Sequence, residues 1–447
     1  MTKRKSIKAA AAVIVIGLAA SVLISSLLVQ SATNNTTAQS PLLQQLPQNL
    51  RRLSTAEAEE TPIDAVVESD APPSEDSTPF DPNSYAYLII HYHKTGHHLS
   101  HALRDFLVST TSNGPPVSNN RENTFQHRMH EESTGCPRAM ELSPGIVHVQ
   151  AAPNFFCDTN LLAEYLLRNN NIFQEKKGVK VIHLVRNPFS LAVSNWIYHA
   201  QYPTPEVWVK SVDPCTEELW FERQSLGELV GPTLLMGDKP IMEYDDVESL
   251  HQLCTTLYQP KQADKSKDWS YYTHLRHLNP QSSLSLATTH MMIQGKSGGD
   301  ILRMANNMIK LKQLQQLEDH IRISQHLVPP KPNERMLQVM TLSMEEFTTD
   351  PRATTLRFLD FALEDASPME VKERIATEYE QSYLEKVKKG DEHITADKEL
   401  QNGDNQNMNE MKGEMEDYLR KHELFGRVLG NIETLVQESL RSSGSVI

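Results

Sequence analysis

The chain has 447 residues, enough for one large domain or two smaller domains with substantial hydrophobic cores. Its formal net charge of −14 argues against a general nucleic-acid-binding protein, so an anionic ligand would need a local basic pocket. The four cysteines include no C-x-x-C pair, which disfavours a zinc knuckle; in an oxidising compartment they could form two disulfides, with three possible pairings.

The N-terminus predicts a membrane anchor. Residues 1–8 carry four basic side chains, and residues 9–29 form an uncharged apolar run that can span a bilayer core of about 30 Å. A long cleaved secretory signal is the alternative, although such signals usually have an apolar region of only about 7–15 residues. Because basic flanks stay in the cytoplasm, we expect a single-pass type II protein whose main domain is luminal.

Residues 30–83 predict a disordered stem. They are rich in Ser, Thr, Gln, Pro and Ala, carry many acidic side chains, and lack hydrophobic periodicity. Asn34 and Asn35 each begin an N-x-Thr sequon, and whether either is glycosylated stays open.

The main domain begins with a strand, a short turn and a helix. Residues 85–92 are rich in aromatic and branched apolar side chains, and the residues from Leu99 onward place their apolar side chains on one helical face. Between them, Lys94 supplies a positive charge, and Gly96 lets the backbone approach a ligand closely. The helix start adds N–H groups and a partial positive charge, so we expect a phosphate or sulfate site. It is not a Walker A motif, because the lysine precedes a single glycine.

Further buried strands are predicted at 145–150, 180–186 and 336–342, with helices at 160–168, after residue 187 and through 356–361. This alternation predicts an α/β fold, a P-loop-like doubly wound parallel sheet flanked by helices. We assign residues 84–400 to this domain, with an insertion at 202–335, and residues 401–447 to a helical C-terminal region. Ligands bind beyond the carboxyl ends of such strands, where Lys94 and Arg186 both lie.

A second motif follows the third of these strands. Arg186 ends the strand, Asn187 is a good N-cap, and Pro188 suits the first helical position. Ser194 follows Arg186 by eight residues and lies about two turns into the helix. Arginine offers a fork of donors to phosphate and serine offers a hydroxyl, so this motif predicts a second anion contact.

These two motifs together resemble the nucleotide-binding motifs of sulfotransferases that use 3′-phosphoadenosine 5′-phosphosulfate (PAPS), in particular the Golgi type that acts on carbohydrates. Lys94-Thr95-Gly96 resembles the family's 5′-phosphosulfate loop, which usually reads Pro-Lys-[Ser/Thr]-Gly-[Ser/Thr]-[Ser/Thr]. Arg186-Asn-Pro with Ser194 resembles its 3′-phosphate signature. The chain departs at His93, which replaces the proline, and at His97-His98, which replace small hydroxyl residues.

Two later segments extend the resemblance. Residues 339–351 are similar to the family's strand, acidic-hydrophobic and Asp-Pro segment, which supports the fold and not the chemistry. Lys389-Gly390 is similar to a late basic-glycine loop that closes over the 3′-phosphate, although a solvated lysine pair explains the segment equally well.

The resemblance implies a set of roles. Lys94 would stabilise charge on the leaving phosphate oxygen, and the backbone of Thr95, Gly96, His97 and His98 would hold the 5′-phosphate. Arg186 and Ser194 would hold the 3′-phosphate, with Lys389 and Gly390 closing over it. His148, on the second strand, is the candidate general base, and a strand histidine with a purely structural role is the alternative.

Substrate and compartment follow from the same resemblance. The acceptor would be a hydroxyl or amine of a glycan or another secretory-pathway molecule, bound through the 202–335 insertion, and no nucleic acid is expected. The protein would be a Golgi membrane enzyme, held by one N-terminal helix. No metal is expected, although His97 and His101 are four residues apart, because the Glu of H-E-x-x-H is missing.

Two other functions stay open. A luminal glycosyltransferase fits the anchor and stem equally well, but it usually needs an Asp-x-Asp metal site, to which Asp245-Asp246 is the nearest match. A non-catalytic, membrane-anchored anion-binding protein would leave Lys94 and Arg186 with structural roles.

Overall fold

The structure is a computed structural model, and all of the residues that it describes belong to one compact unit, Val67–Ile447. The described residues are 84–110, 142, 145, 147–153, 155, 178–201, 240–258, 270–293, 299–324, 335–389 and 405–444. The predicted anchor, the stem and the helix at 160–168 lie outside these ranges. Within the ranges, no helix is both long enough and apolar enough to cross a membrane.

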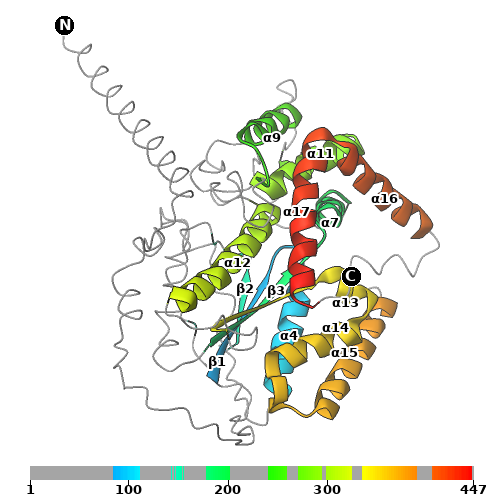
Figure 1. The fold of residues 1–447 in the computed structure, drawn as a ribbon. Coiled ribbons are helices and arrows are strands. Elements are labelled where there is room, and N and C mark those ends of the chain that lie inside the picture. Colours follow the sequence, from blue (N-terminus) through cyan, green and yellow to red (C-terminus); the bar gives the residue numbers. More distant parts are fainter. Residues whose placement is uncertain are drawn as a thin grey trace, which may run out of the picture. The chain divides into compact units, whose positions relative to one another are not determined.

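Four parallel strands form the sheet (Figure 1), which confirms the predicted α/β class. They are β1 (Tyr85–His91), β2 (Val147–Ala151), β3 (Gly178–Val185) and β4 (Leu337–Ser343), in the spatial order β2-β1-β3-β4. Every residue of β3 is buried. Helices cover both faces, which explains why β1, β3 and β4 are buried along nearly their whole length.

The strand order creates a switch point between β1 and β3. After β1 the chain passes to β2 on one side, and it then returns to place β3 on the other side of β1. In the register of this central pair, Ile90 lies beside His183, so the two strands end at the same edge of the sheet. Open α/β sheets bind ligands at such a point, because the connections leave in opposite directions and open a crevice between them.

Twelve helical elements surround the sheet within the described residues. They are α4 (His97–Thr110), α7 (Pro188–Gln201), α9 (Tyr244–Leu257), α10 (Tyr271–His277), α11 (Pro280–Ile293), α12 (Asp300–Ser324), α13 (Met344–Thr349), α14 (Pro351–Leu363), the 3-10 turn η9 (Glu364–Ala366), α15 (Met369–Lys389), α16 (Asn405–Lys421) and α17 (Glu423–Ser442).

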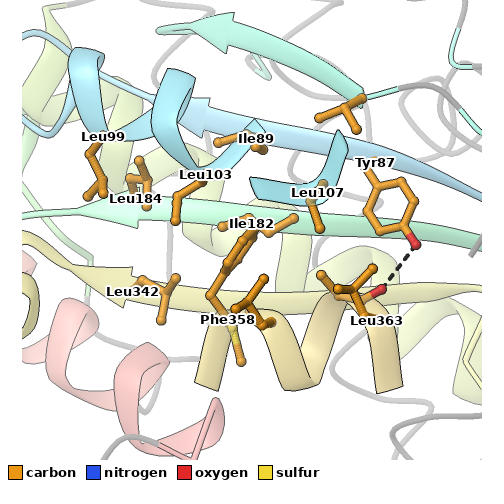
Figure 2. Close-up of a cluster of buried hydrophobic side chains, with 14 of the residues drawn as sticks. Tyr87, Ile89, Leu99, Leu103, Leu107, Ile182, Leu184, Leu342, Phe358 and Leu363 are labelled. Carbon is orange, nitrogen blue, oxygen red and sulfur yellow. Dashed lines mark hydrogen bonds between the residues drawn. The ribbon is translucent and has the colours of Figure 1, made fainter. Parts of the chain in front are cut away.

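One face of the sheet packs against α4, α14 and α15. Figure 2 shows side chains of β1, β3 and β4 meeting those of α4 and α14 in one apolar cluster. The Tyr87 hydroxyl reaches across this cluster and donates to the Ala362 carbonyl at 3.0 Å, so its polar end is satisfied inside the core. Burial of these side chains holds α4 in place, and α4 begins directly after the Lys94 loop.

A buried polar network joins the opposite face to α12. Asn307 Nδ2 donates to the Tyr92 hydroxyl at 2.8 Å and to the Pro153 carbonyl at 2.7 Å. The hydroxyl lies 2.7 Å from His183 Nε2 and can donate its own proton there. The network ties the carboxyl ends of β1 and β3 to α12 and to the chain after β2.

The C-terminal residues form two helices that contact each other, α16 and α17, as the apolar spacing predicts helical structure there. Helix α17 packs against β4, α7 and α12, with its apolar side buried. The C-terminal helices are therefore part of the domain's own core.

Candidate functional site

The turn after β1 has a backbone conformation that favours a functional role. Lys94 has φ +61° and Gly96 has φ +111°. The Thr95 hydroxyl accepts from the Tyr92 N–H at 2.6 Å, and the Thr95 N–H donates to the Tyr92 carbonyl at 3.1 Å. Left-handed φ in a residue other than glycine costs about 1–3 kcal/mol and persists where the surroundings enforce it, often at ligand sites.

Gly96 has two reasons to be glycine. Its φ of +111° is unfavourable for an L side chain, and a Cβ there would lie 2.8 Å from Met344 Sδ of α13. The Lys94 loop therefore packs closely against the chain after β4. Helix α4 begins at the next residue and has no acidic side chain in its first turn that would compete with an anion.

The Lys94 ammonium lies over an aromatic ring of α7. Its Nζ is 2.9 Å from the centroid of the Tyr198 ring, a cation–π contact. The neighbouring His93 ring stacks on His199 of the same helix, with centroids 5.3 Å apart. The loop and α7 thus meet through side chains that the sequence separates by about one hundred residues.

A carboxylate of α12 holds the start of the loop. The His93 N–H donates to Asp300 Oδ2 at 3.1 Å, and Asp300 Oδ1 lies 3.9 Å from Arg303 Nη1. Burial raises the pKa of Asp300, while Arg303 and the His93 N–H act in the opposite direction. Because α12 falls within the 202–335 insertion, this insertion takes part in shaping the anion loop.

Arg186 brings the two predicted motifs together. Its Nη1 donates to the Lys94 carbonyl at 3.2 Å, so the ends of β1 and β3 are joined at the switch point. Its Nε lies 3.7 Å from Glu345 Oε1. Burial raises the pKa of Glu345, and the charge of Arg186 opposes this shift. The site thus holds a positive guanidinium that is partly neutralised by the carboxylates of Glu345 and Glu416.

The start of α7 agrees with its predicted cap. Asn187 Oδ1 accepts from the Phe189 N–H at 3.0 Å, and Pro188 is the first helical residue. The C-terminal helices contact the same turn, because Asn187 Nδ2 donates to Glu433 at 2.5 Å and Ser190 Oγ donates to Glu416 at 2.8 Å. Ser194, one turn further, has 3 % of its surface exposed.

His148 lies away from the strand ends. It pairs with Leu88 in the register of the sheet, three positions before Ala151, where β2 ends beside His91. At about 3.3 Å per residue this is roughly 10 Å below the edge that carries Lys94. Burial lowers the pKa of His148 to about 4. His93 lies in the anion loop itself, directly before Lys94, and is therefore closer to the Lys94 ammonium than His148 is.

Other predicted positions have local roles or fall outside the structure. Lys389 is the last residue of α15, and Gly390 lies outside the described residues. The rings of His97 and His101 are 4.8 Å apart, but within the described ranges no cluster of three or more His, Cys, Asp or Glu side chains could hold a metal ion. Asp246 belongs to the capping box of α9 and accepts two hydrogen bonds from Arg427.

Sequence reasoning missed the side chains that α7, α12 and α13 add to the site. Tyr198, Asp300 and Glu345 contact Lys94, His93 and Arg186 respectively. One signal was present, because Tyr198 follows Ser194 by four residues and therefore shares its side of the helix. Glu345 falls within the 339–351 segment, which the resemblance relates to the fold and not to the site, and Asp300 stands in no motif.

The arrangement can bind and polarise an anion. It combines a strained turn, a helix start, an ammonium and a guanidinium at a switch point of a parallel sheet. Comparison with known proteins adds no relative, since no family model, no curated protein and no solved structure matches this chain.

Proposed function

We propose that this chain is a PAPS-dependent sulfotransferase that transfers a sulfuryl group to a hydroxyl or amine of a glycan or another secretory-pathway acceptor. The observation that carries the proposal is the 3.2 Å hydrogen bond from Arg186 to the Lys94 carbonyl. The two motifs that resemble the family's 5′- and 3′-phosphate contacts are far apart in sequence, yet they meet at the one edge where a doubly wound sheet binds nucleotides.

Each side chain has a separate role in this proposal. The first-turn N–H groups of α4 bind the 5′-phosphate, and Lys94 stabilises the charge that develops on its leaving oxygen. Arg186 binds the 3′-phosphate, and Ser194 adds a hydroxyl where the ligand reaches it. PAPS supplies the activated sulfuryl group. The bond from sulfur to the phosphate oxygen breaks, a bond from sulfur to the acceptor forms, and the acceptor proton passes to a base.

His93 is a better candidate for that base than His148. It adjoins Lys94, and its backbone is fixed by Asp300. A general base has to come within hydrogen-bonding reach of the acceptor, and His148 lies well below the strand ends.

The compartment proposed is the Golgi lumen, with the chain anchored through residues 9–29 as a type II membrane protein. The basic flank and the apolar run support this topology. Cys254, the one cysteine among the described residues, is disulfide-bonded. Disulfides persist in oxidising compartments, which agrees with a luminal domain.

The alternative functions have less support. A glycosyltransferase would need its acidic metal site, and the nearest candidate, Asp246, is engaged by Arg427 and by the cap of α9. Turnover distinguishes an enzyme from a protein that only binds the nucleotide.

The test of the proposal is transfer of radiolabelled sulfate from PAPS to a panel of glycans by the full chain in detergent. Transfer that requires Lys94 supports the proposal, and transfer from a nucleotide sugar instead would replace it.

Arg186→Ala is expected to weaken adenosine 3′,5′-bisphosphate binding by roughly 10- to 150-fold, while adenosine 5′-phosphate binding changes by less than about threefold. Loss of a charge-assisted hydrogen bond costs about 1.5–3 kcal/mol, and Arg186 is proposed to contact the 3′-phosphate alone. Isothermal titration calorimetry with both ligands measures the two affinities. Equal losses for both ligands would contradict the assignment of Arg186.

Glu345→Gln is expected to strengthen adenosine 3′,5′-bisphosphate binding by roughly 3- to 10-fold at low salt. The carboxylate lies 3.7 Å from Arg186 Nε and repels a phosphate that binds there, and glutamine keeps the shape without the charge. Glu373→Gln is the matched control, since Glu373 pairs with Arg352, away from the site. Tighter binding in both variants would show a general charge effect, and unchanged binding in the Glu345 variant would place the 3′-phosphate elsewhere.

A further inference from the structure

The contact between Lys94 and Tyr198 involves a residue, Tyr198, that belongs to neither of the two predicted nucleotide-binding motifs. Tyr198 lies in α7, twelve residues after Arg186, and its ring lies 2.9 Å from the Lys94 ammonium. The face of an aromatic ring is negative, and a phenol ring attracts a cation without neutralising it as a carboxylate does. Such a contact can hold an ammonium in place and leave its charge available to an anion.

Two histidine rings, one of them in the Lys94 loop, contact the Tyr198 ring and hold it in place. His93 lies edge-on to Tyr198 with centroids 5.9 Å apart, and His199 lies at 5.2 Å. His93 and His199 also stack on one another, with planes 6° apart. The three rings connect α7 to the loop at the residue that precedes Lys94.

A lysine side chain has several rotatable bonds, so a fixed backbone does not fix its ammonium. In this loop the left-handed φ of Lys94 fixes the start of the side chain, and the Tyr198 ring fixes its end. We propose that Tyr198 is a positioning residue, which holds the Lys94 ammonium at the edge between β1 and β3. The effect on turnover rests on the proposed sulfotransferase function, whereas the positioning of Lys94 can be measured without it.

The experiment compares Tyr198→Leu, which removes the ring, with Tyr198→Phe, which keeps it, in the full chain in detergent. Tyr272→Leu is the matched control, because Tyr272 is also half-buried and contacts a cation, Arg276 of α10. The first measurement is the rate at which acetic anhydride acetylates Lys94, followed by mass spectrometry. The reference is Lys421, whose side chain is 79 % exposed.

The expected result is that Tyr198→Leu raises the relative acetylation rate of Lys94 by roughly 3- to 10-fold, whereas Tyr198→Phe and Tyr272→Leu stay within about twofold of wild type. The second measurement is single-turnover sulfate transfer. Tyr198→Leu should lower kcat by roughly 3- to 30-fold with little change in KM, and Tyr198→Phe should restore it.

Equal acetylation of Lys94 in wild type and Tyr198→Leu would overturn the proposal, as would a Tyr198→Phe variant that behaves like Tyr198→Leu. Thermal unfolding checks that each variant folds, and Tyr198→Gln replaces the leucine variant in the same comparison if the latter does not fold. If the wild-type chain transfers no sulfate, the proposed function fails, and the acetylation comparison still decides the role of Tyr198.

Discussion

Lys94→Ala is expected to lower the rate of sulfate transfer by roughly 10²–10³, and to weaken binding of adenosine 3′,5′-bisphosphate by far less. The lysine is proposed to stabilise charge on the phosphate oxygen that leaves, and this charge grows only in the transition state. An interaction made mainly in the transition state lowers kcat, whereas one made equally in the ground state alters KM.

The measurement is single-turnover transfer at saturating PAPS, with circular dichroism as the folding control. The fold should survive, because the Lys94 side chain lies at a strand end beside Tyr198 and contributes little to the core. Lys94→Arg should restore only part of the rate, since a planar guanidinium does not replace a compact ammonium in a tight turn. A folded Lys94→Ala protein that retains near wild-type turnover would remove the loop from the mechanism.

Lowering the pH from 6.5 to 5.0 is expected to reduce the free energy of unfolding by roughly 5 kcal/mol, which is a large part of the usual 5–15 kcal/mol. This value counts the three histidines that are most deeply buried among those with a lowered pKa, and His148 would add to the loss. Burial lowers the pKa of His91 to about 4, with further lowering by His97, and burial lowers the pKa of both His183 and His290 to about 3.

The sign follows from which state binds protons. The unfolded chain protonates these imidazoles below its ordinary pKa of about 6.5, while the folded chain keeps them neutral until the pH nears their lowered pKa values. Between those limits the unfolded state holds more protons, so stability falls as the pH falls. Well below pH 6.5 each group contributes about 1.4 kcal/mol per pH unit, and the three together contribute about 4. At pH 6.5 the slope is half as large, because only half of the unfolded imidazoles are protonated there.

Urea unfolding between pH 7.5 and pH 5 measures this slope. His91→Leu is the informative variant, because His91 is buried and burial is the main cause of its lowered pKa. It should remove about one third of the part of the slope that the three histidines contribute, and make the protein more stable than wild type at pH 5. A stability that stays constant from pH 7 to pH 5 would show that these imidazoles are not held neutral by the fold.

The sequence predicted the sheet well for a physical reason. β1, β3 and β4 are covered on both faces and almost wholly buried, so each is mostly apolar, although Lys180 and His183 interrupt β3 and Gln338 and Thr341 interrupt β4. The Lys94 loop and Arg186 stand at the carboxyl ends of β1 and β3. Parallel strands place their carboxyl ends along one edge, which made it possible to predict that the two motifs meet.

The rest of the site depends on tertiary contacts that leave no local pattern. Helix α11 is buried along nearly its whole length, so its apolar and polar residues show no helical stripe, and the 202–335 insertion gave no motif. Asp300 contacts His93, and Glu345 contacts Arg186 and accepts from the Asn187 N–H. The contact of Glu433 with Asn187 joins residues 246 positions apart. Such pairs become visible only once the strand order and the helix packing are known.

The most direct test of the central claim, that the Lys94 loop and Arg186 form one nucleotide site, is a calorimetric titration of the full wild-type chain with adenosine 3′,5′-bisphosphate. The site at the β1/β3 switch point predicts saturable binding of one nucleotide per chain, tighter than that of adenosine 5′-phosphate. It also predicts that binding is lost when Lys94 and Arg186 are both replaced by alanine in a chain that still folds. Absence of binding to the wild-type chain, or binding that the double replacement leaves unchanged, would contradict the claim.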